Sequence, residues 1–172
     1  MHLRVYQAFL QRGKMDWLIE KAQEIGIQEF CPLETERTMV KVDSQDYPHL
    51  LDRWQKIIRE AAKQSGSLQT MKVVAPRSFK KAVKECPASE ITAIFHPDSS
   101  GTDFRQWCEK NGMFSEKLSR KKFHLFFGPE GGFSDEEVSR AQSSGAETIT
   151  LGSGILRTDT AFVAAAGFFT FD

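Results

Sequence analysis

Apolar positions along the chain alternate between two spacings, one typical of strands and one typical of helices. Short apolar runs predict strands, and apolar residues every three to four positions predict amphipathic helices between them. The predicted strands are His2–Leu10, Phe30–Leu33, Lys72–Ala75, Ile91–Phe95, Phe123–Phe127 and Glu147–Leu151. The predicted helices are Lys14–Ile25, Tyr47–Gln64, Phe79–Glu85, Thr102–Lys110, one that begins at Ser134, and Thr160–Phe171. This order predicts an α/β fold with a largely parallel sheet that helices cover on both faces.

Local signals mark where several of these helices begin and end. Gly26 follows the first helix as a stop, and Ser134 with Glu137 three positions later forms a capping box. Thr158 or Asp159 is suited to cap the last helix. Trp17 and Trp54 lie within the apolar stripes of their helices, so we expect both in the core.

Length and composition narrow the class of protein. A chain of 172 residues has the length of one domain or of a large part of a two-domain protein. Its 40% apolar and 27% charged residues are typical of a globular protein and argue against a disordered or fibrous one. The longest apolar stretch, Ala161–Phe171, is shorter than the roughly 20 residues of a membrane-spanning helix. Its three cysteines show neither a disulfide framework nor a zinc motif, and no signal peptide is apparent. We therefore expect a cytoplasmic protein that needs no metal.

The net charge of zero hides a basic segment. Between Arg53 and Lys84 there is a single acidic residue, Glu60. Such a run either attracts a polyanion such as a nucleic acid or forms a solvated surface. Nine basic residues make up the segment: Arg53, Lys56, Arg59, Lys63, Lys72, Arg77, Lys80, Lys81 and Lys84.

Two glycine-bearing loops follow predicted strands, where ligands bind in open α/β sheets. The first lies in FFGPEGGFSDEE, residues 126–137, and is interpreted equally well as a tight turn or as a ligand loop. The second lies in TLGSGILRTDTAFVAAAGF, residues 150–168. Its Arg157 is suited to hold a phosphate or a uracil carbonyl that gains negative charge. The alternative is a structural arginine paired with Asp159 or Glu130.

Taken together, GPEGGFS and LGxxILRTxTA resemble the RsmE family of the SPOUT methyltransferase superfamily. Upstream segments fit in the same order: Lys14-Met15, residues 21–26, residues 35–38 and residues 60–66. The resemblance implies an S-adenosylmethionine-dependent enzyme that methylates N3 of a uridine in 16S ribosomal RNA of the small ribosomal subunit. It also implies a deep trefoil knot in the C-terminal part of the sheet and a homodimer.

If the chain methylates a uridine as the resemblance implies, the chemistry predicts roles for particular residues. Arg157 would stabilise the uracil anion, with Glu130 as its orienter or as a proton acceptor, because the N3 proton must leave. Arg37, Lys41, Lys63 and Gln64 are the candidate RNA contacts. The expected S-adenosylmethionine site consists of His96, Gly128, Pro129, Glu130, Gly131, Gly132, Leu151, Gly152, Ser153, Ile155, Leu156 and Thr160.

The chain also departs from the family pattern. Similar enzymes carry an N-terminal PUA-like RNA-binding barrel, whereas residues 1–172 are expected to form the SPOUT methyltransferase domain alone. Ser153-Gly154 replaces a usual Pro-Arg, Ser67 replaces an arginine, and Asp159 replaces a glutamate.

Three other functions therefore stay open. One is a SPOUT enzyme acting on a different RNA position, such as a ribose hydroxyl. Another is a catalytically impaired RNA-binding homologue, and the third is an unrelated α/β enzyme acting on a small molecule.

Overall fold

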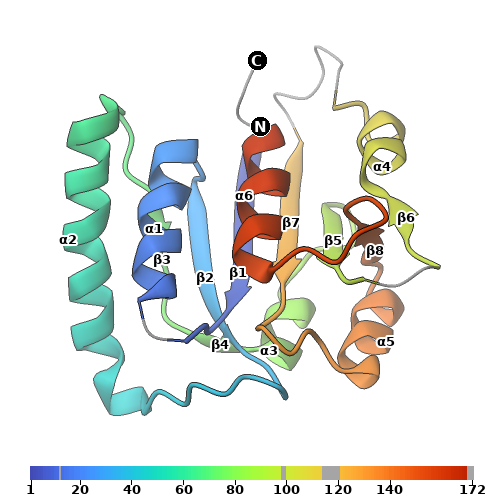
Figure 1. Ribbon diagram of the computed structural model, residues 1–172, viewed down its shortest axis with the longest axis horizontal. Helices are drawn as coiled ribbons and strands as arrows, with labels where there is room; N and C mark the ends of the chain where they lie inside the picture. The colour runs from blue at the N-terminus through green and yellow to red at the C-terminus, as the bar shows by residue number, and fades with distance from the viewer. Residues whose placement is uncertain (12, 98–99, 114–120, 170–172) are drawn as a thin grey trace.

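The computed structural model describes residues 1–11, 13–97, 100–113 and 121–169, and its centre is an eight-stranded sheet. Seven strands follow the order β3-β2-β1-β7-β5-β8-β6, β4 pairs with β2, and all these pairs are parallel (Figure 1). The strands are β1 (His2–Ala8), β2 (Glu29–Glu34), β3 (Lys72–Val73), β4 (Arg77–Ser78), β5 (Ile91–Phe95), β6 (Thr102–Asp103), β7 (Lys122–Phe127) and β8 (Glu147–Thr150).

Helices on both faces cover this sheet, so the predicted fold class is confirmed. They are α1 (Lys14–Ile25), α2 (Tyr47–Ser65), α3 (Phe79–Lys84), α4 (Phe104–Lys110), α5 (Asp135–Ser143) and α6 (Thr158–Phe168), with a 3-10 turn at Ser44–Asp46. Figure 1 shows α2 at the outer edge beside α1, and α6 next to β1 and β7. The trefoil knot stays a prediction.

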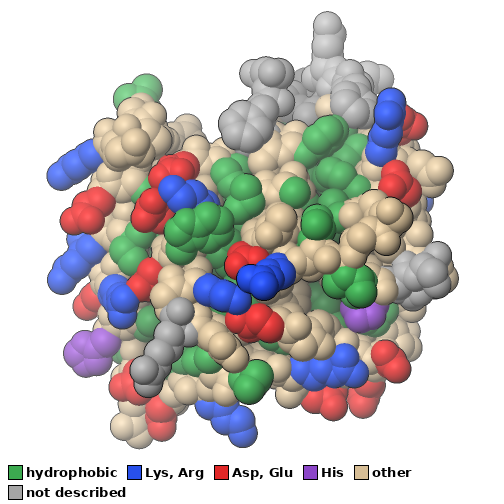
Figure 2. All heavy atoms as spheres, viewed as in Figure 1, with side chains coloured by type: hydrophobic (Ala, Val, Ile, Leu, Met, Phe, Trp, Pro, Cys, Tyr) green, Lys and Arg blue, Asp and Glu red, His purple; other side chains and the backbone are tan. Residues whose placement is uncertain are grey.

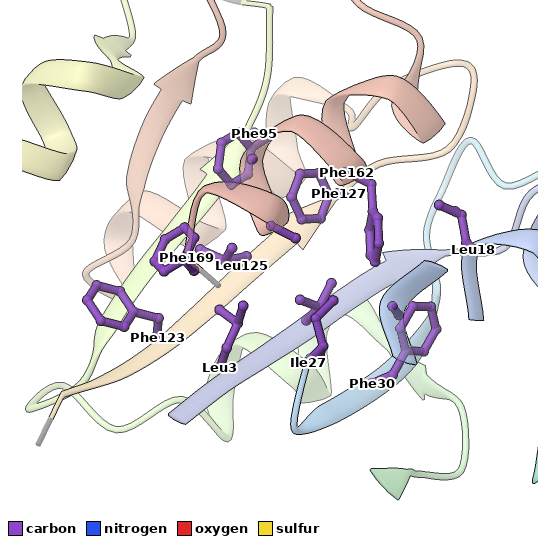
Figure 3. Packing of buried hydrophobic residues seen from close by; sticks show 14 of the residues in the cluster. Leu3, Leu18, Ile27, Phe30, Phe95, Phe123, Leu125, Phe127, Phe162 and Phe169 are labelled. Atoms are coloured by element: carbon purple, nitrogen blue, oxygen red, sulfur yellow. The ribbon is translucent and has the colours of Figure 1, made fainter. Parts of the chain in front are cut away.

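The alternation of side chains along the strands builds one apolar cluster on each face of the sheet. In β1, Leu3 and Val5 join the cluster that α1, α2, α4 and α6 cover. Tyr6 and Ala8 point the other way, into the cluster under α3 and α5. Figure 3 shows how phenylalanines from β5, β7 and α6 fill the larger cluster, where the Phe95 and Phe127 rings stack at 4.6 Å.

The helix boundaries follow the local signals closely. Helix α1 has the predicted bounds, and Gly26 ends it with a φ of 89°, in the left-handed region. The capping box of Ser134 and Glu137 is present at α5. Helix α6 begins two residues earlier than predicted, and residues 170–171 of the predicted helix lie outside the described residues. The two-residue strands β4 and β6 were not predicted, because they are too short to show an apolar pattern. Residues 102–103, predicted as the start of a helix, form β6, and α4 begins at Phe104.

The two tryptophans of α1 and α2 have different environments. Trp54 is buried as predicted, and its indole N–H donates to a carboxylate oxygen of Asp16 at 3.1 Å. The prediction for Trp17 was wrong, since its side chain is 45% exposed. Buried Met15, Leu18 and Ile19 form the inward face of this turn of α1, and Trp17 lies outside it.

A buried histidine at the start of β7 links stability to pH. His124 Nε2 lies 2.5 Å from a carboxylate oxygen of Glu90, and its Nδ1 lies 3.4 Å from the Tyr6 hydroxyl. Burial lowers the pKa of His124, although the bond to Glu90 opposes this shift. The hydrogen bond from His124 and the ion pair with Lys122 lower the pKa of Glu90. Both groups therefore resist protonation in the folded chain more than in the unfolded chain.

Acidification is thus expected to destabilise the fold. Below the ordinary histidine pKa of about 6.5, the unfolded chain binds a proton that folded His124 resists. The free energy of unfolding therefore decreases as the pH is lowered. Glu90 adds to the loss below the ordinary glutamate pKa of 4.5. Thermal unfolding between pH 7.5 and pH 5 measures the effect, and His124→Gln should show a smaller fall in melting temperature than the wild type. An equal fall in both proteins would contradict the assignment.

Candidate functional site

One cavity of about 900 Å³ lies at the carboxyl ends of three neighbouring strands, β7, β5 and β8. The loops that follow these strands line it, together with Lys14, Arg37, and the start of α6 at Thr158 and Ala161. Its volume lies in the range of sites for small molecules and cofactors, about 300–1,000 Å³. The parallel sheet thus brings the two glycine-bearing loops of the sequence to a single site.

The loop after β7 is packed too tightly for side chains at some positions. A Cβ atom at Gly128 would lie 3.2 Å from three atoms of Gly132 and Phe133, two of them backbone atoms. Gly132 has a φ of +70°, a conformation that other residues rarely adopt. Gly131 is different, because a Cβ there would meet its nearest atom, Arg37 Cβ, at 3.5 Å. Gly128 and Gly132 therefore fix the shape of the loop, and Gly131 tolerates more.

Side chains from two other segments hold the outer part of this loop. Glu130 accepts hydrogen bonds from the Gln11 backbone N–H and from Lys14 Nζ, each at 3.2 Å. The guanidinium Nη1 of Arg37 donates to the carbonyls of Gly131 and Phe133, at 3.2 and 3.1 Å. Arg37 thus has a structural role at the cavity in addition to its predicted contact with RNA.

Arg157 comes from the loop after β8 and lines the same cavity. Its side chain is exposed, and within the described part of the chain no hydrogen bond or ion pair holds it. The two structural pairings considered for it, with Asp159 and with Glu130, are therefore not formed among these residues. Glu130 is instead paired with Lys14, so no direct contact supports its role as the orienter of Arg157.

The structure places almost all of the predicted cofactor residues around the cavity. His96 follows β5 and lines it, and its buried Nδ1 has no hydrogen-bond partner among the described residues. Thr160 is the exception, since it is exposed on α6 and is not a lining residue. The lining residues predicted from sequence are Arg37, His96, Gly128, Pro129, Glu130, Gly131, Gly132, Leu151, Gly152, Ser153, Ile155, Leu156 and Arg157.

The other predicted RNA contacts lie away from the cavity lining. Lys63 and Gln64 belong to the last turn of α2, which leads into the parallel strand β3 and therefore ends at the amino edge of the sheet. Figure 1 shows this end of α2 opposite the loop at residues 128–133. Lys41 is exposed on the segment after β2 and does not line the cavity.

The basic run does not form one surface. Its α2 residues lie on a helix packed into the larger apolar cluster, whereas α3, with Lys80, Lys81 and Lys84, covers the opposite face of the sheet. Arg53 is paired with Asp16, and Arg77 with Glu85. Charge that is concentrated along the sequence is therefore divided in space.

Sequence reasoning gave Lys14, Gln7 and Thr158 no role in the site, although the structure connects all three to it. Lys14 lies just beyond β1, at the same sheet edge as the cavity, and this position was a signal that could have identified it. Gln7 is a polar residue within a buried strand, which is a weaker signal. Thr158 was expected at most as a helix cap, but the cap position is Arg157, and the Thr158 hydroxyl donates to the Gly128 carbonyl.

Neither a metal site nor a membrane-spanning helix is present in the described part of the chain. Its ranges contain no cluster of three or more His, Cys, Asp or Glu side chains arranged to hold a metal ion. Within them, no helix combines the length and the apolar character that crossing a membrane requires.

Fold and cavity together define a parallel α/β protein with a cavity of cofactor size at the carboxyl ends of the strands. The profile of the RNA methyltransferase domain family matches residues 1–170, so the chain belongs to this family.

Curated relatives confirm the resemblance to the RsmE family. The chain is 31% identical over 161 residues to ribosomal RNA small subunit methyltransferase E of Bacillus subtilis, which covers 92% of this chain and 62% of that protein. The enzyme of the same name from Synechocystis is 33% identical over 144 residues, covering 84% and 45% of the two chains. The chain thus spans about half to two thirds of the length of these relatives.

Solved structures share the fold. A methyltransferase from Legionella pneumophila, solved with bound S-adenosylmethionine, has a TM-score of 0.85 and 29% identity, covering 98% of this chain and 65% of that one. Ribosomal RNA small subunit methyltransferase E from Neisseria gonorrhoeae, also bound to S-adenosylmethionine, has a TM-score of 0.81 and 25% identity, covering 96% and 64%.

Proposed function

We propose that this chain is an S-adenosylmethionine-dependent methyltransferase domain that acts on N3 of a uridine in 16S ribosomal RNA. The observation that carries the proposal is the single cavity in which both glycine-bearing loops and Arg157 meet. The names of the curated relatives and the cofactor in two similar structures support the same assignment.

The residues around the cavity fit S-adenosylmethionine. The loops after β7 and β8 line the cavity with several glycines and offer backbone N–H and C=O groups to a polar ligand. The loop after β8 also lines the cavity with two apolar side chains, Ile155 and Leu156. When bound there, the cofactor would supply an electrophilic methyl group on its sulfonium.

The side chains of the cavity have distinct tasks in this proposal. N3 of uridine carries a weakly acidic proton, and its loss leaves negative charge on the base oxygens. Arg157, unpaired among the described residues, stabilises this charge through its guanidinium. Glu130 stays our candidate acceptor for the proton. Lys14 Nζ, 3.2 Å from Glu130 Oε1, holds this carboxylate in place.

RNA enters this proposal as the partner that reaches the cavity beside Lys14 and Arg37. Phosphates would meet these lining cations first, and Lys41, Lys63 and Gln64 would contact more distant parts of the RNA. A ribosomal RNA substrate would be consistent with the cytoplasmic location that the sequence predicts.

The proposed homodimer would bury the outer face of α6. Apolar side chains are exposed on and beside this helix (Figure 2), including Phe168 at 40%. Partly exposed Val163 and exposed Ala164 extend the apolar surface along α6. Contact with a second copy would remove these apolar side chains from water.

Calorimetric titration of S-adenosylmethionine into the 172-residue chain tests the cofactor, and we expect a dissociation constant in the micromolar range. Mass spectrometry of nucleosides from treated small ribosomal subunits then identifies the product, which we expect to be 3-methyluridine. A ribose-methylated product would favour the alternative SPOUT activity. A folded chain that binds no cofactor would overturn the proposal.

A further inference from the structure

The carbonyl of Gly128 accepts two hydrogen bonds from side chains that lie far from it in the sequence. The Thr158 hydroxyl donates at 2.7 Å from the first turn of α6, and Gln7 Nε2 donates at 3.1 Å from the end of β1. The two donors are also close to each other, with 3.5 Å between Gln7 Nε2 and Thr158 Oγ1. Three segments far apart in the sequence thus meet at one backbone oxygen.

Gln7 is fully buried and does not line the cavity, so it can affect a ligand only through its neighbours. Its amide nitrogen donates to Gly128 and to the Ala8 carbonyl, at 3.1 and 3.0 Å. Its oxygen Oε1 is buried and has no partner within the described residues. A buried polar group is costly unless it is hydrogen-bonded, so the amide donors are what this side chain contributes.

Thr158 lies directly after Arg157, and this order links the Gly128 contact to the reacting end of the site. The Arg157 side chain makes no hydrogen bond or ion pair with described residues. The position of its backbone therefore largely determines where its guanidinium lies. Successive Cα atoms are about 3.8 Å apart, and the anchor of Thr158 is therefore also the anchor of Arg157. The Gly128 end of this contact belongs to the loop after β7, where a Cβ at Gly128 would lie only 3.2 Å from backbone atoms of Gly132 and Phe133.

We propose that Gln7 and Thr158 are positioning residues that hold the Gly128 carbonyl, and so fix the loop after β7 relative to Arg157. The proposal rests on the methyltransferase function proposed above, because it concerns the alignment of the cofactor loop with the residue that stabilises the base. Alignment matters greatly for a transfer reaction, since a shift of about 1 Å can cost a hundredfold in rate.

Four single variants of the 172-residue chain test the proposal. Thr158→Val removes the hydroxyl at nearly constant volume, and Thr158→Ser keeps it. Gln7→Met removes the amide donors. Gln23→Met is the matched control, because Gln23 is equally buried and bridges to the Gln69 carbonyl and the Met71 N–H, away from the cavity lining.

Three measurements are made on each variant: melting temperature, S-adenosylhomocysteine affinity by calorimetry, and kcat at saturating cofactor and ribosomal subunits. We expect Thr158→Val and Gln7→Met to lower kcat about tenfold or more, and to weaken S-adenosylhomocysteine binding severalfold. Thr158→Ser keeps the hydroxyl donor, so its kcat and its S-adenosylhomocysteine affinity should stay within about threefold of the wild-type values. Gln23→Met should lower the melting temperature without a matching loss of kcat.

The outcomes separate this proposal from the proposed function. A wild-type chain that binds no S-adenosylhomocysteine and methylates nothing overturns both. An active wild type whose rate survives Thr158→Val overturns the positioning role alone. Equal losses of kcat in Gln23→Met and Gln7→Met would show that only general stability is involved, and would also overturn it.

Discussion

Arg157→Ala is expected to lower the rate of methyl transfer about a hundredfold or more, with cofactor affinity within about threefold of the wild type. Removing one preorganised donor to a developing negative charge typically costs a factor of about 10² to 10³ in rate. Arg157 is exposed at the cavity, and the described residues offer its guanidinium no partner whose loss would unfold the chain. The effect should therefore be confined to the chemical step. Single-turnover methylation measures the transfer rate, and calorimetry measures the cofactor affinity.

Arg157→Lys sharpens this test. Lysine keeps the charge but loses the planar fork of donors, so we expect a rate between those of the wild type and Arg157→Ala. Unchanged melting temperatures would show that the fold is intact in both variants. Full transfer activity in Arg157→Ala would remove Arg157 from the mechanism.

The fold was predictable because its signals are local. Apolar spacing alone located α1, and the Ser134–Glu137 pair located the start of α5, since both depend on residues within one or two turns. Parallel pairing then followed from the alternation of strands and helices. This pairing also brings the two glycine-bearing loops to one edge of the sheet, and most of the residues predicted to contact the cofactor line the cavity there.

The contacts within the site were not predictable, because their partners lie far apart in the sequence. Lys14 and Glu130 are 116 positions apart, and Gln7 and Gly128 are 121 apart. No spacing rule connects such residues, so the sequence showed Glu130 as a possible partner of Arg157 and not as the partner of Lys14. The exposure of a side chain also depends on contacts with distant segments. Trp17, for example, lies outside the face of α1 that packs against the rest of the chain.

Local charge was misleading for a related reason. Nine basic residues between Arg53 and Lys84 suggest a single surface, but the chain passes from one face of the sheet to the other between α2 and α3. The cations that do share a surface at the cavity are Lys14, Arg37 and Arg157, which come from three separate segments. An electrostatic site of this kind becomes visible only when the topology is known.

Gly128→Ala is expected to lower the affinity for S-adenosylmethionine at least tenfold, although alanine adds only one carbon atom. The new Cβ would lie 3.2 Å from backbone atoms of Gly132 and Phe133, which cannot move aside as a flexible side chain can. The loop must shift to accommodate it, and overpacking of this kind typically costs about 1–3 kcal/mol. Because the Gly128 carbonyl also binds Thr158, the shift would be transmitted to the start of α6.

Two neighbouring glycines provide the controls for this variant. In Gly131→Ala the new Cβ would meet Arg37 Cβ at 3.5 Å, an ordinary contact, and in Gly154→Ala it would meet nothing within 4 Å. Both positions line the cavity as Gly128 does, so we expect affinities within about threefold of the wild type by calorimetry. If all three variants bind equally well, the tight packing at Gly128 does not shape the cofactor site. If only Gly128→Ala loses binding, the fixed backbone of the loop after β7 holds the cofactor, and glycine is required there because of its lack of a Cβ.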